Sequence, residues 1–305
     1  MTKTENEKEC VSECDFLCEK RLLKTNPALH RLYRSSVFAM DMLLSGYKNI
    51  FPFFTDHTFE HSEQVINYCN IIAGKEIVPF LNSDEIYILL MGAALHDVGM
   101  GISEDDFHCF CSDIPGLAAY RERFPGELTA EYTRAFHQEF SAQFIKKYSG
   151  VFEIPSEEHI HCIAQVARGH RNADLLDRDG FPEAYPLPNG NTVNLAYLAA
   201  LVKFADELDV TADRNLFFDY TVVNREWSAK QTMCFKCHGA IKSLCVRDDA
   251  VVLMYDTQEP EVEEEILRTY GKVENTFGEY ITVLEKRTSF PKKLSQLKLE
   301  KVRQL

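Results

Sequence analysis

The amino-acid sequence predicts a mainly α-helical protein, a helical bundle with a small α+β appendage at its C-terminal end. Over residues 8–214, apolar side chains recur at the three- and four-residue spacing of helices. From about residue 215 the pattern changes to short apolar runs typical of strands, followed by one long amphipathic helix. We therefore expect a helical domain over residues 1–214, with its core at about 50–214, and a small α+β subdomain over residues 215–305.

The first helical segment is expected over residues 8–48. Cys10, Cys14 and Cys18 recur there every four residues, so they share one face of the helix. A metal or redox cluster would use such spacing. Small apolar side chains packed on one face explain it more simply, and we interpret these cysteines as packing residues.

The next two helices are marked by their caps. One helix begins at a cap between Thr55 and Thr58 and ends at Gly74. The run Asn-Ser-Asp-Glu at residues 82–85 caps the following helix. Its body, IYILLMGAALHDVG at residues 86–99, is apolar nearly all round, which predicts a central, buried helix.

The rest of the helical domain alternates between periodic and irregular stretches. Residues 102–130 are interrupted by Pro and Gly, and we interpret them as an insertion or lid. Helical periodicity returns at residues 129–148 and 156–170. Residues 172–192 are turn-rich and predict a surface loop, and a last helix follows over residues 194–214.

The C-terminal subdomain is predicted to contain strands at residues 232–248 and 250–256 and a helix at residues 260–287. The run CFKCH at residues 234–238 matches a short haem-attachment pattern and could also offer ligands to zinc. Haem attachment requires export, and the sequence carries no export signal. Alternating side chains on a strand are the simpler interpretation.

Net charge limits the classes of partner. The chain has 305 residues and a formal net charge of −14, from 33 Lys+Arg against 47 Asp+Glu. Binding to long nucleic acid depends on neutralising phosphates, so we expect no long DNA or RNA partner. No stretch approaches the roughly 20 apolar residues that cross a bilayer, and the polar N-terminus lacks a signal peptide. We expect no membrane partner, a cytoplasmic location, and reduced thiols at all ten cysteines.

Histidines and carboxylates interrupt the apolar pattern of successive predicted helices. Neighbouring members of this set are 33 to 40 residues apart, about one helix plus a connection, so an antiparallel bundle could bring them together. The candidate metal ligands are His61, His96, Asp97, His137, His170 and Asp206. The adjacent pair at the end of the apolar helix is the most informative, because a buried ionised Asp is costly unless it is paired or bound to metal. A nitrogen and oxygen donor set suits Mn, Fe, Co, Ni or Zn.

These motifs resemble those of the HD superfamily of metal-dependent phosphohydrolases over roughly residues 50–215. The segments are HSEQV from His61, ALHDVG around His96-Asp97, and ADELD around Asp206. In that family the first His, the HD pair and the last Asp bind one metal, which implies the same role for the matching residues here. The HTFEHS opening, the HDVGM signature and the ending LVKFADELDVTADR at residues 201–214 are similar to the HD-CE type.

The segments RAFHQEFSA and ARGHR are similar to those that supply ligands to a second metal ion in binuclear members of the family. The resemblance therefore implies that His137 and His170 bind a second ion and that Asp97 bridges the two. The implied cofactor is two divalent ions (Mn, Fe, Co, Ni, Zn or Mg), and the implied function is hydrolysis of a nucleotide or related small phosphoester by a metal-activated water. A homodimer is the oligomeric state that the resemblance suggests.

Further side chains are candidates for catalysis or substrate binding. The candidate catalytic residues are Asp97, His57, Lys203 and Arg134, and the candidate substrate-binding residues are Arg171, Lys203 and Arg214. His57 lies one helical turn before His61 and is a candidate general acid. For the basic residues, ion pairs that hold the bundle together are the competing interpretation, and Asp209 with Arg214 has the spacing of such a pair.

Two departures narrow the function. Met100 stands where HD-GYP cyclic-dinucleotide phosphodiesterases carry Lys, and Gln138 follows His137 where deoxynucleotide triphosphohydrolases usually carry Glu. These departures weaken the assignment of the protein to either of those two enzyme classes. The alternatives are a diiron oxygenase of the HD type and a non-catalytic nucleotide-sensing or scaffolding domain.

Overall fold

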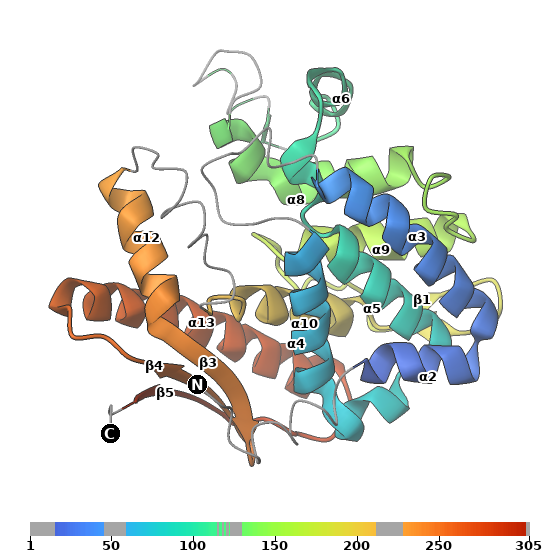
Figure 1. Cartoon of the computed structure of the whole chain (residues 1–305). Coiled ribbons are helices and arrows are strands. Elements are labelled where there is room, and N and C mark those ends of the chain that lie inside the picture. The colour runs from blue at the N-terminus through green and yellow to red at the C-terminus, as the bar shows by residue number, and fades with distance from the viewer. Residues whose placement is uncertain are drawn as a thin grey trace.

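The computed structural model describes residues 16–45, 59–114, 116–117, 119, 122, 130–211 and 228–302. It confirms a mainly α fold, in which a helical bundle adjoins a small C-terminal sheet (Figure 1). The bundle contains α2 (Leu17–Thr25), α3 (Pro27–Ser45), α4 (Phe59–Ile77), α5 (Ser83–Leu95), α6 (Glu104–Phe110), α8 (Ala130–Lys147), α9 (Glu157–Gly169) and α10 (Leu195–Glu207). Short 3₁₀ helices follow α4 and α5, namely η2 (Val78–Phe80) and η3 (Val98–Gly101).

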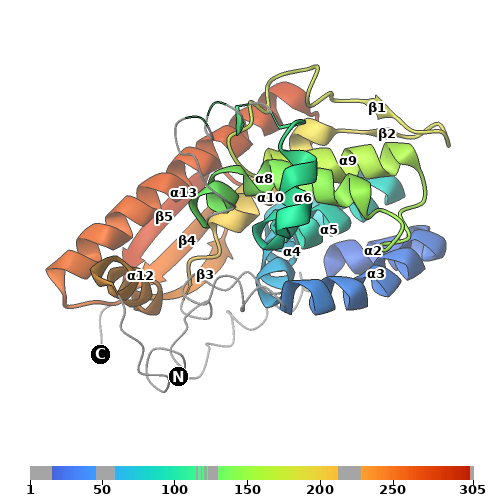
Figure 2. The ribbon, with the colours of Figure 1, turned by 90° about the horizontal axis from the view of Figure 1, so that it is seen from above.

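Helix α5 is the centre of the bundle. Its N-cap is Asn82, whose side chain accepts hydrogen bonds from the backbone N–H groups of Asp84 and Glu85, while the Glu85 carboxylate accepts one from the Asn82 N–H. This capping box confirms the predicted start. Residues from Asp84 to Leu95 are all buried, and the helix contacts α2, α3, α4, α9 and α10 (Figure 2). The all-round apolar pattern therefore did predict a buried helix.

The N-terminal segment forms two helices where the sequence predicted one helical stretch. Asn26 separates α2 from α3 because Pro27 cannot donate a backbone hydrogen bond, and the Asn26 side chain accepts one from Leu29. Cys18 is buried at the contact with α4, where its backbone N–H donates to Asn70, and it acts as a packing residue. Cys10 and Cys14 lie outside the described residues.

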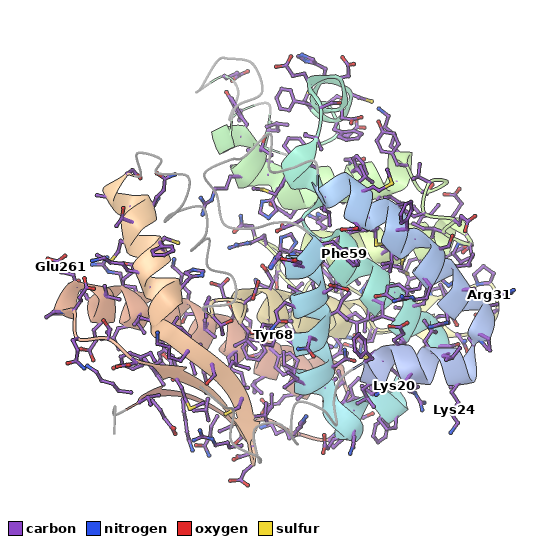
Figure 3. All side chains as sticks on the ribbon, in the orientation of Figure 1. Lys20, Lys24, Arg31, Phe59, Tyr68 and Glu261 are labelled. Atoms are coloured by element: carbon purple, nitrogen blue, oxygen red, sulfur yellow. The ribbon has the colours of Figure 1, made fainter. Side chains whose placement is uncertain are left out.

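Burial divides the helices into inner and outer faces (Figure 3). Phe59 and Tyr68 of α4 are buried in the core. The labelled charged side chains are exposed at the surface of α2, α3 and the start of α13 (Pro260–Arg287): Lys20, Lys24, Arg31 and Glu261. Among the described residues no single helix is long and apolar enough to cross a membrane, and one pair bent by 107°, Ser83–Gly101 with Glu104–Phe110, passes that test by length and composition alone.

The C-terminal subdomain corrects one prediction of secondary structure. It contains α12 (Ala229–Ala240), β3 (Ile241–Arg247), β4 (Ala250–Tyr255), α13 (Pro260–Arg287) and β5 (Gln296–Lys301). Strand β4 pairs antiparallel with β3 and parallel with β5, and α13 is the crossover between the parallel strands. The strand predicted over residues 232–248 is wrong for its first half, because a capping box between Ser228 and Gln231 starts a helix there.

Helix α13 joins the subdomain to the bundle. Tyr280 packs on Tyr197 of α10, and Phe277 packs on Phe204 of the same helix. Buried Arg287 donates hydrogen bonds to backbone carbonyls in the 172–192 loop. The apolar core is therefore continuous from the bundle into the subdomain. The predicted domain boundary at residues 214–215 lies outside the described residues.

The 172–192 loop is ordered by Asp84 at the start of α5. The loop includes a short hairpin, in which β1 (Tyr185–Pro186) pairs with β2 (Thr192–Val193). Asp84 accepts hydrogen bonds from His159 at 2.9 Å, Asn189 at 3.0 Å and Asn191 at 2.7 Å. Burial would raise the pKa of Asp84, but these hydrogen bonds together lower it to about 2.

Replacing Asp84 with Asn is expected to lower the free energy of unfolding by about 2 kcal/mol at pH 7. The folded-state pKa lies below the unfolded value of about 3.9, so the carboxylate stabilises the fold above pH 4. This contribution is lost as pH falls from 4 towards 2. Urea unfolding at pH 7 and pH 3 measures the difference, with Asp179→Asn as the exposed control in the same loop. Equal stability of wild type and Asp84→Asn at pH 7 would contradict the assignment.

Candidate metal centre

Six buried side chains from five segments converge inside the bundle. His61 lies in the first turn of α4, His137 in the middle of α8, and Asp206 in the last turn of α10. The remaining three side chains directly follow two helices: His96 and Asp97 come after the end of α5, and His170 comes after the end of α9. All six are at most 8% exposed. The structure therefore brings together the complete set of predicted ligands.

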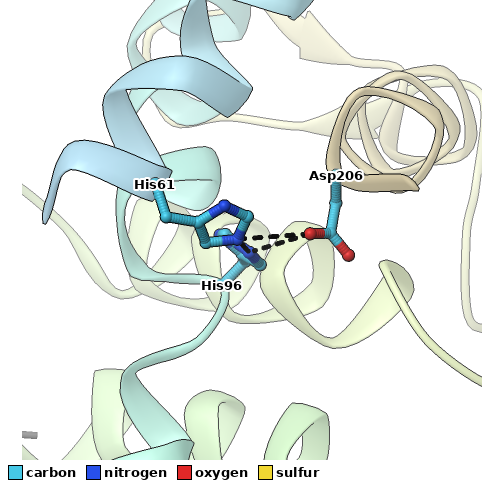
Figure 4. Close-up of side chains that lie close together, drawn as sticks. All are labelled: His61, His96 and Asp206. Atoms are coloured by element: carbon cyan, nitrogen blue, oxygen red, sulfur yellow. Dashed lines mark hydrogen bonds and ion pairs between the residues drawn. The ribbon is translucent and has the colours of Figure 1, made fainter. Parts of the chain in front are cut away.

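The first ligand group consists of His61, His96 and Asp206 (Figure 4). The Nε2 atoms of the two histidines are 3.2 Å apart, and Asp206 Oδ1 lies 3.3 Å from His61 Nε2 and 3.6 Å from His96 Nε2. Asp97 adds a fourth donor from the side. Its Oδ2 atom is 3.6 Å from His61 Nε2 and 3.5 Å from His96 Nε2.

The second ligand group consists of Asp97, His137 and His170. The two Nε2 atoms are 2.9 Å apart, and Asp97 Oδ1 is 3.4 Å from His137 Nε2 and 3.5 Å from His170 Nε2. Asp97 therefore directs one carboxylate oxygen to each group. A carboxylate in this position can bridge two cations.

The hydrogen bonds of the histidines fix which nitrogen is available to a ligand. Each Nδ1 atom faces an oxygen acceptor, so the ring hydrogen belongs on Nδ1. The acceptors are Asp209 Oδ2 at 2.6 Å for His61, Ala93 O at 2.7 Å for His96, Arg134 O at 2.9 Å for His137 and Ala167 O at 2.5 Å for His170. The Nε2 lone pairs consequently face one another, an arrangement that a cation between them stabilises.

The spacing of the donors fits a metal ion. A cation held at about 2.0–2.1 Å by four tetrahedral donors separates those donors by about 3.3–3.4 Å. Around the first group the measured donor separations run from 3.2 to 3.6 Å. The first group therefore has the donor spacing of a metal site, and both buried His/Asp groups could hold metal ions.

Electrostatics at the first ligand group also favour a positive charge. Burial would lower the pKa of His96, but Asp97 and Asp206 outweigh it and raise the pKa to about 9. Burial would likewise raise the pKa of Asp206, yet hydrogen bonds with His61 and His96 keep it well below its ordinary value. At the second group, burial dominates and lowers the pKa of His137 to about 3, so this imidazole is a neutral ligand.

A serine on α8 connects the two groups. Ser141 Oγ donates to His96 O at 2.6 Å and accepts from the Gly99 N–H at 2.8 Å. One hydroxyl thus holds the turn after α5 against the helix that supplies His137. The close approach requires Gly99, since a Cβ there would lie 2.1 Å from His137 O and 2.5 Å from Ser141 N.

A cavity of about 640 Å³ opens onto the centre. Asp97, His137 and Asp206 line it, and the predicted Arg134 and Arg171 line it as well. Arg171 also lies 3.9 Å from Glu207. Another part of the wall comes from α12 and α13, which the sequence did not connect with the site: Lys230, Met233, Cys234, Cys237, His238, Glu265, Arg268, Thr269 and Lys272.

Several predicted roles have a different structural setting. Lys203 Nζ is 2.6 Å from Glu279 on α13, and this lysine does not line the cavity. It therefore holds α10 to α13, as the ion-pair interpretation expected. His57 and Arg214 lie outside the described residues. Asp209 orients His61, a role that the sequence analysis missed; it lies just after the end of α10, three residues after Asp206.

A helical bundle with an adjacent His-Asp pair inside a buried His/Asp centre defines an HD-domain protein. The family model HD-CE matches residues 51–281. The chain therefore belongs to the HD-CE family, and the match extends through α12, β3 and β4 into α13. Comparison with curated proteins and with solved structures gave no match.

Replacing Asp209 with Ala is expected to weaken metal binding at the first group by about 10–100-fold. His61 would lose the acceptor that fixes its tautomer and ring orientation. Titration of metal-depleted protein with Mn²⁺, followed by equilibrium dialysis, measures the change, and Asp179→Ala is the control. Unchanged affinity of Asp209→Ala for both equivalents of metal would contradict this role.

Proposed function

We propose that this protein is a metal-dependent phosphohydrolase that uses two divalent cations to hydrolyse a nucleotide or related small phosphoester. One observation carries the proposal. Asp97 presents Oδ2 to the two histidines of the first ligand group and Oδ1 to the two histidines of the second. Paired, bridged sites of this kind suit displacement at phosphorus, because charge develops on several oxygens at once.

The donor set indicates which ions the centre prefers. Four imidazoles and two carboxylates surround it. Imidazole suits Mn, Fe, Co, Ni and Zn better than Mg, which prefers oxygen donors and bound water. When bound, two such cations would lower the pKa of a water molecule and neutralise charge on the phosphate oxygens.

The surrounding side chains supply the rest of a phosphate site. Arg134 and Arg171 line the cavity beside Asp97, where guanidinium groups can hold non-bridging phosphate oxygens. Burial would lower the pKa of Arg171, but Asp206 and Glu207 raise it, so this side chain stays charged. Arg134 is also coupled to the metal ligands, since its carbonyl accepts the hydrogen bond from His137.

The experiment is a metal-by-substrate panel. Protein depleted of metal is reloaded separately with Mn²⁺, Fe²⁺, Co²⁺, Ni²⁺, Zn²⁺ or Mg²⁺ and assayed for phosphate release from nucleoside mono-, di- and triphosphates and from bis(p-nitrophenyl) phosphate. We expect turnover with at least one transition metal and its loss on chelation. Nucleotide binding without turnover for every metal would support a sensing domain instead. Oxygen consumption by the iron-loaded protein without phosphate release would support an oxygenase.

A further inference from the structure

The C-terminal subdomain contributes one face of each of two helices to the cavity. Five α12 positions line it, all within the span Lys230 to His238 and at the spacing of a single helical face. Four α13 positions, from Glu265 to Lys272, do the same. The two helices contact each other, and α12 stands against the N-terminal half of α13 (Figure 1).

This wall is basic. Lys230, Arg268 and Lys272 line it, against the single acid Glu265. Arg268 is paired with Glu264 and Glu265, at 2.6 and 3.0 Å. Within the part of the chain that the structure describes, neither lysine has an ion-pair partner.

These three cations face one cavity although the chain has a net charge of −14. Like charges that face one cavity repel one another, and an anionic ligand relieves that repulsion. The two aspartates of the metal centre face its histidines, and the proposed cations between these groups would neutralise their charge. The lysines of the C-terminal wall are therefore available to an anion that enters the cavity.

The cavity has room for more than the reacting phosphate. Its volume of about 640 Å³ lies within the range of about 300–1,000 Å³ typical of small-molecule sites. Apolar side chains also line it, among them Met100, Val210 and Met233. A ligand with an apolar body and two anionic ends would match this distribution of side chains.

We infer that the substrate carries a second phosphate group, which binds to Lys230, Arg268 and Lys272 while the first lies at the metal centre. The inference rests on the proposed function and names its substrate class: a nucleoside diphosphate or bisphosphate, or a compound of the same charge pattern. Monophosphates would use only half of the cavity. The C-terminal subdomain would then select the substrate.

The test compares variants with the same change in net charge. Lys230→Met/Lys272→Met removes the two lysines of the cavity wall. Lys236→Met/Lys286→Met removes one lysine from each of the same two helices at positions that do not line the cavity, and it is the matched control. Binding of AMP, ADP and adenosine 3′,5′-bisphosphate is measured by calorimetry on the metal-loaded protein, because the first phosphate is placed at the metal centre. KM is measured on the metal-loaded protein.

We expect the wild type and the control to bind ADP or the bisphosphate at least about tenfold more tightly than AMP, since each 1.4 kcal/mol is worth a factor of ten. The cavity variant should lose this preference, and the control variant should hydrolyse bis(p-nitrophenyl) phosphate with an unchanged kcat. ADP carries two adjacent phosphates, whereas the bisphosphate carries them on opposite sides of the ribose. Comparing their affinities shows which spacing of the two phosphates the cavity prefers. The absence of any preference in the wild type, or its persistence in the cavity variant, overturns the inference. Phosphate preference without hydrolysis under any metal overturns the proposed function alone.

Discussion

Asp97→Ala is expected to abolish metal retention in both ligand groups and to reduce turnover by at least roughly a thousandfold. Asp97 is the only described residue that offers one oxygen to each group. Its loss leaves His137 and His170 without a carboxylate partner in the second group. Two neutral imidazoles alone form a weak site for a divalent cation.

Comparison with Asp206→Ala isolates the bridging role. Asp206 is paired with the two histidines of the first group, so its replacement should release about one ion per chain, whereas Asp97→Ala should release both. Metal per chain is measured by elemental analysis after dialysis, and phosphate release is measured in parallel. Asp105→Ala, an exposed change on α6, is the control. An Asp97→Ala protein that keeps two ions and normal turnover would refute the proposed centre.

The elements that the sequence predicted well carry their own local signals. Helix α5 has a capping box and an all-round apolar body, and both features are visible in residues 82–95. Helix α13 begins at Pro260 and ends at Arg287, the limits that its amphipathic pattern predicted. Such signals depend on neighbours within one or two turns, which the sequence displays directly.

The elements that were missed depend on distant contacts. Residues 229–240 contain small and aromatic side chains that suit either a strand or a helix, and packing against α13 supports the helix. Strand β5 is short, and most of it is exposed or half-exposed. It forms a strand because it pairs in parallel with β4, whose paired residues lie 46 positions earlier in the sequence (Ala250 with Gln296).

The candidate site also combines residues that local sequence motifs reveal with residues that only distant contacts bring together. The candidate ligands follow motifs, so the sequence could name all six residues that the structure brings together. Substrate contacts follow no motif. Lys203 was a candidate to hold phosphate oxygens, yet it pairs with Glu279 of a distant helix. Lys230 and Lys272 carried no signal, because only the fold brings α12 and α13 to the cavity.

Gly99→Ala is expected to destabilise the protein by about 1–3 kcal/mol or more and to disturb the second ligand group. A Cβ at this position would lie 2.1 Å from His137 O, 2.5 Å from Ser141 N and 2.8 Å from Ser141 Oγ. The first two are backbone atoms of α8, which cannot move aside as a flexible side chain can. Relief therefore requires α8 to move away from η3, and His137 moves with it.

Two measurements separate this effect from a general loss of stability. Urea unfolding gives the change in free energy, and metal titration of the folded protein shows whether the second ion is lost before the first. Gly278→Ala is the matched control, because nothing lies within 4 Å of a Cβ there and alanine should stabilise α13 by about 0.5–1 kcal/mol. A Gly99→Ala protein with wild-type stability and two tightly held ions would show that the approach of η3 to α8 does not position His137. If the second ion is lost selectively, the glycine after the His-Asp pair belongs to the metal centre, because it sets the distance between the helices that supply its ligands.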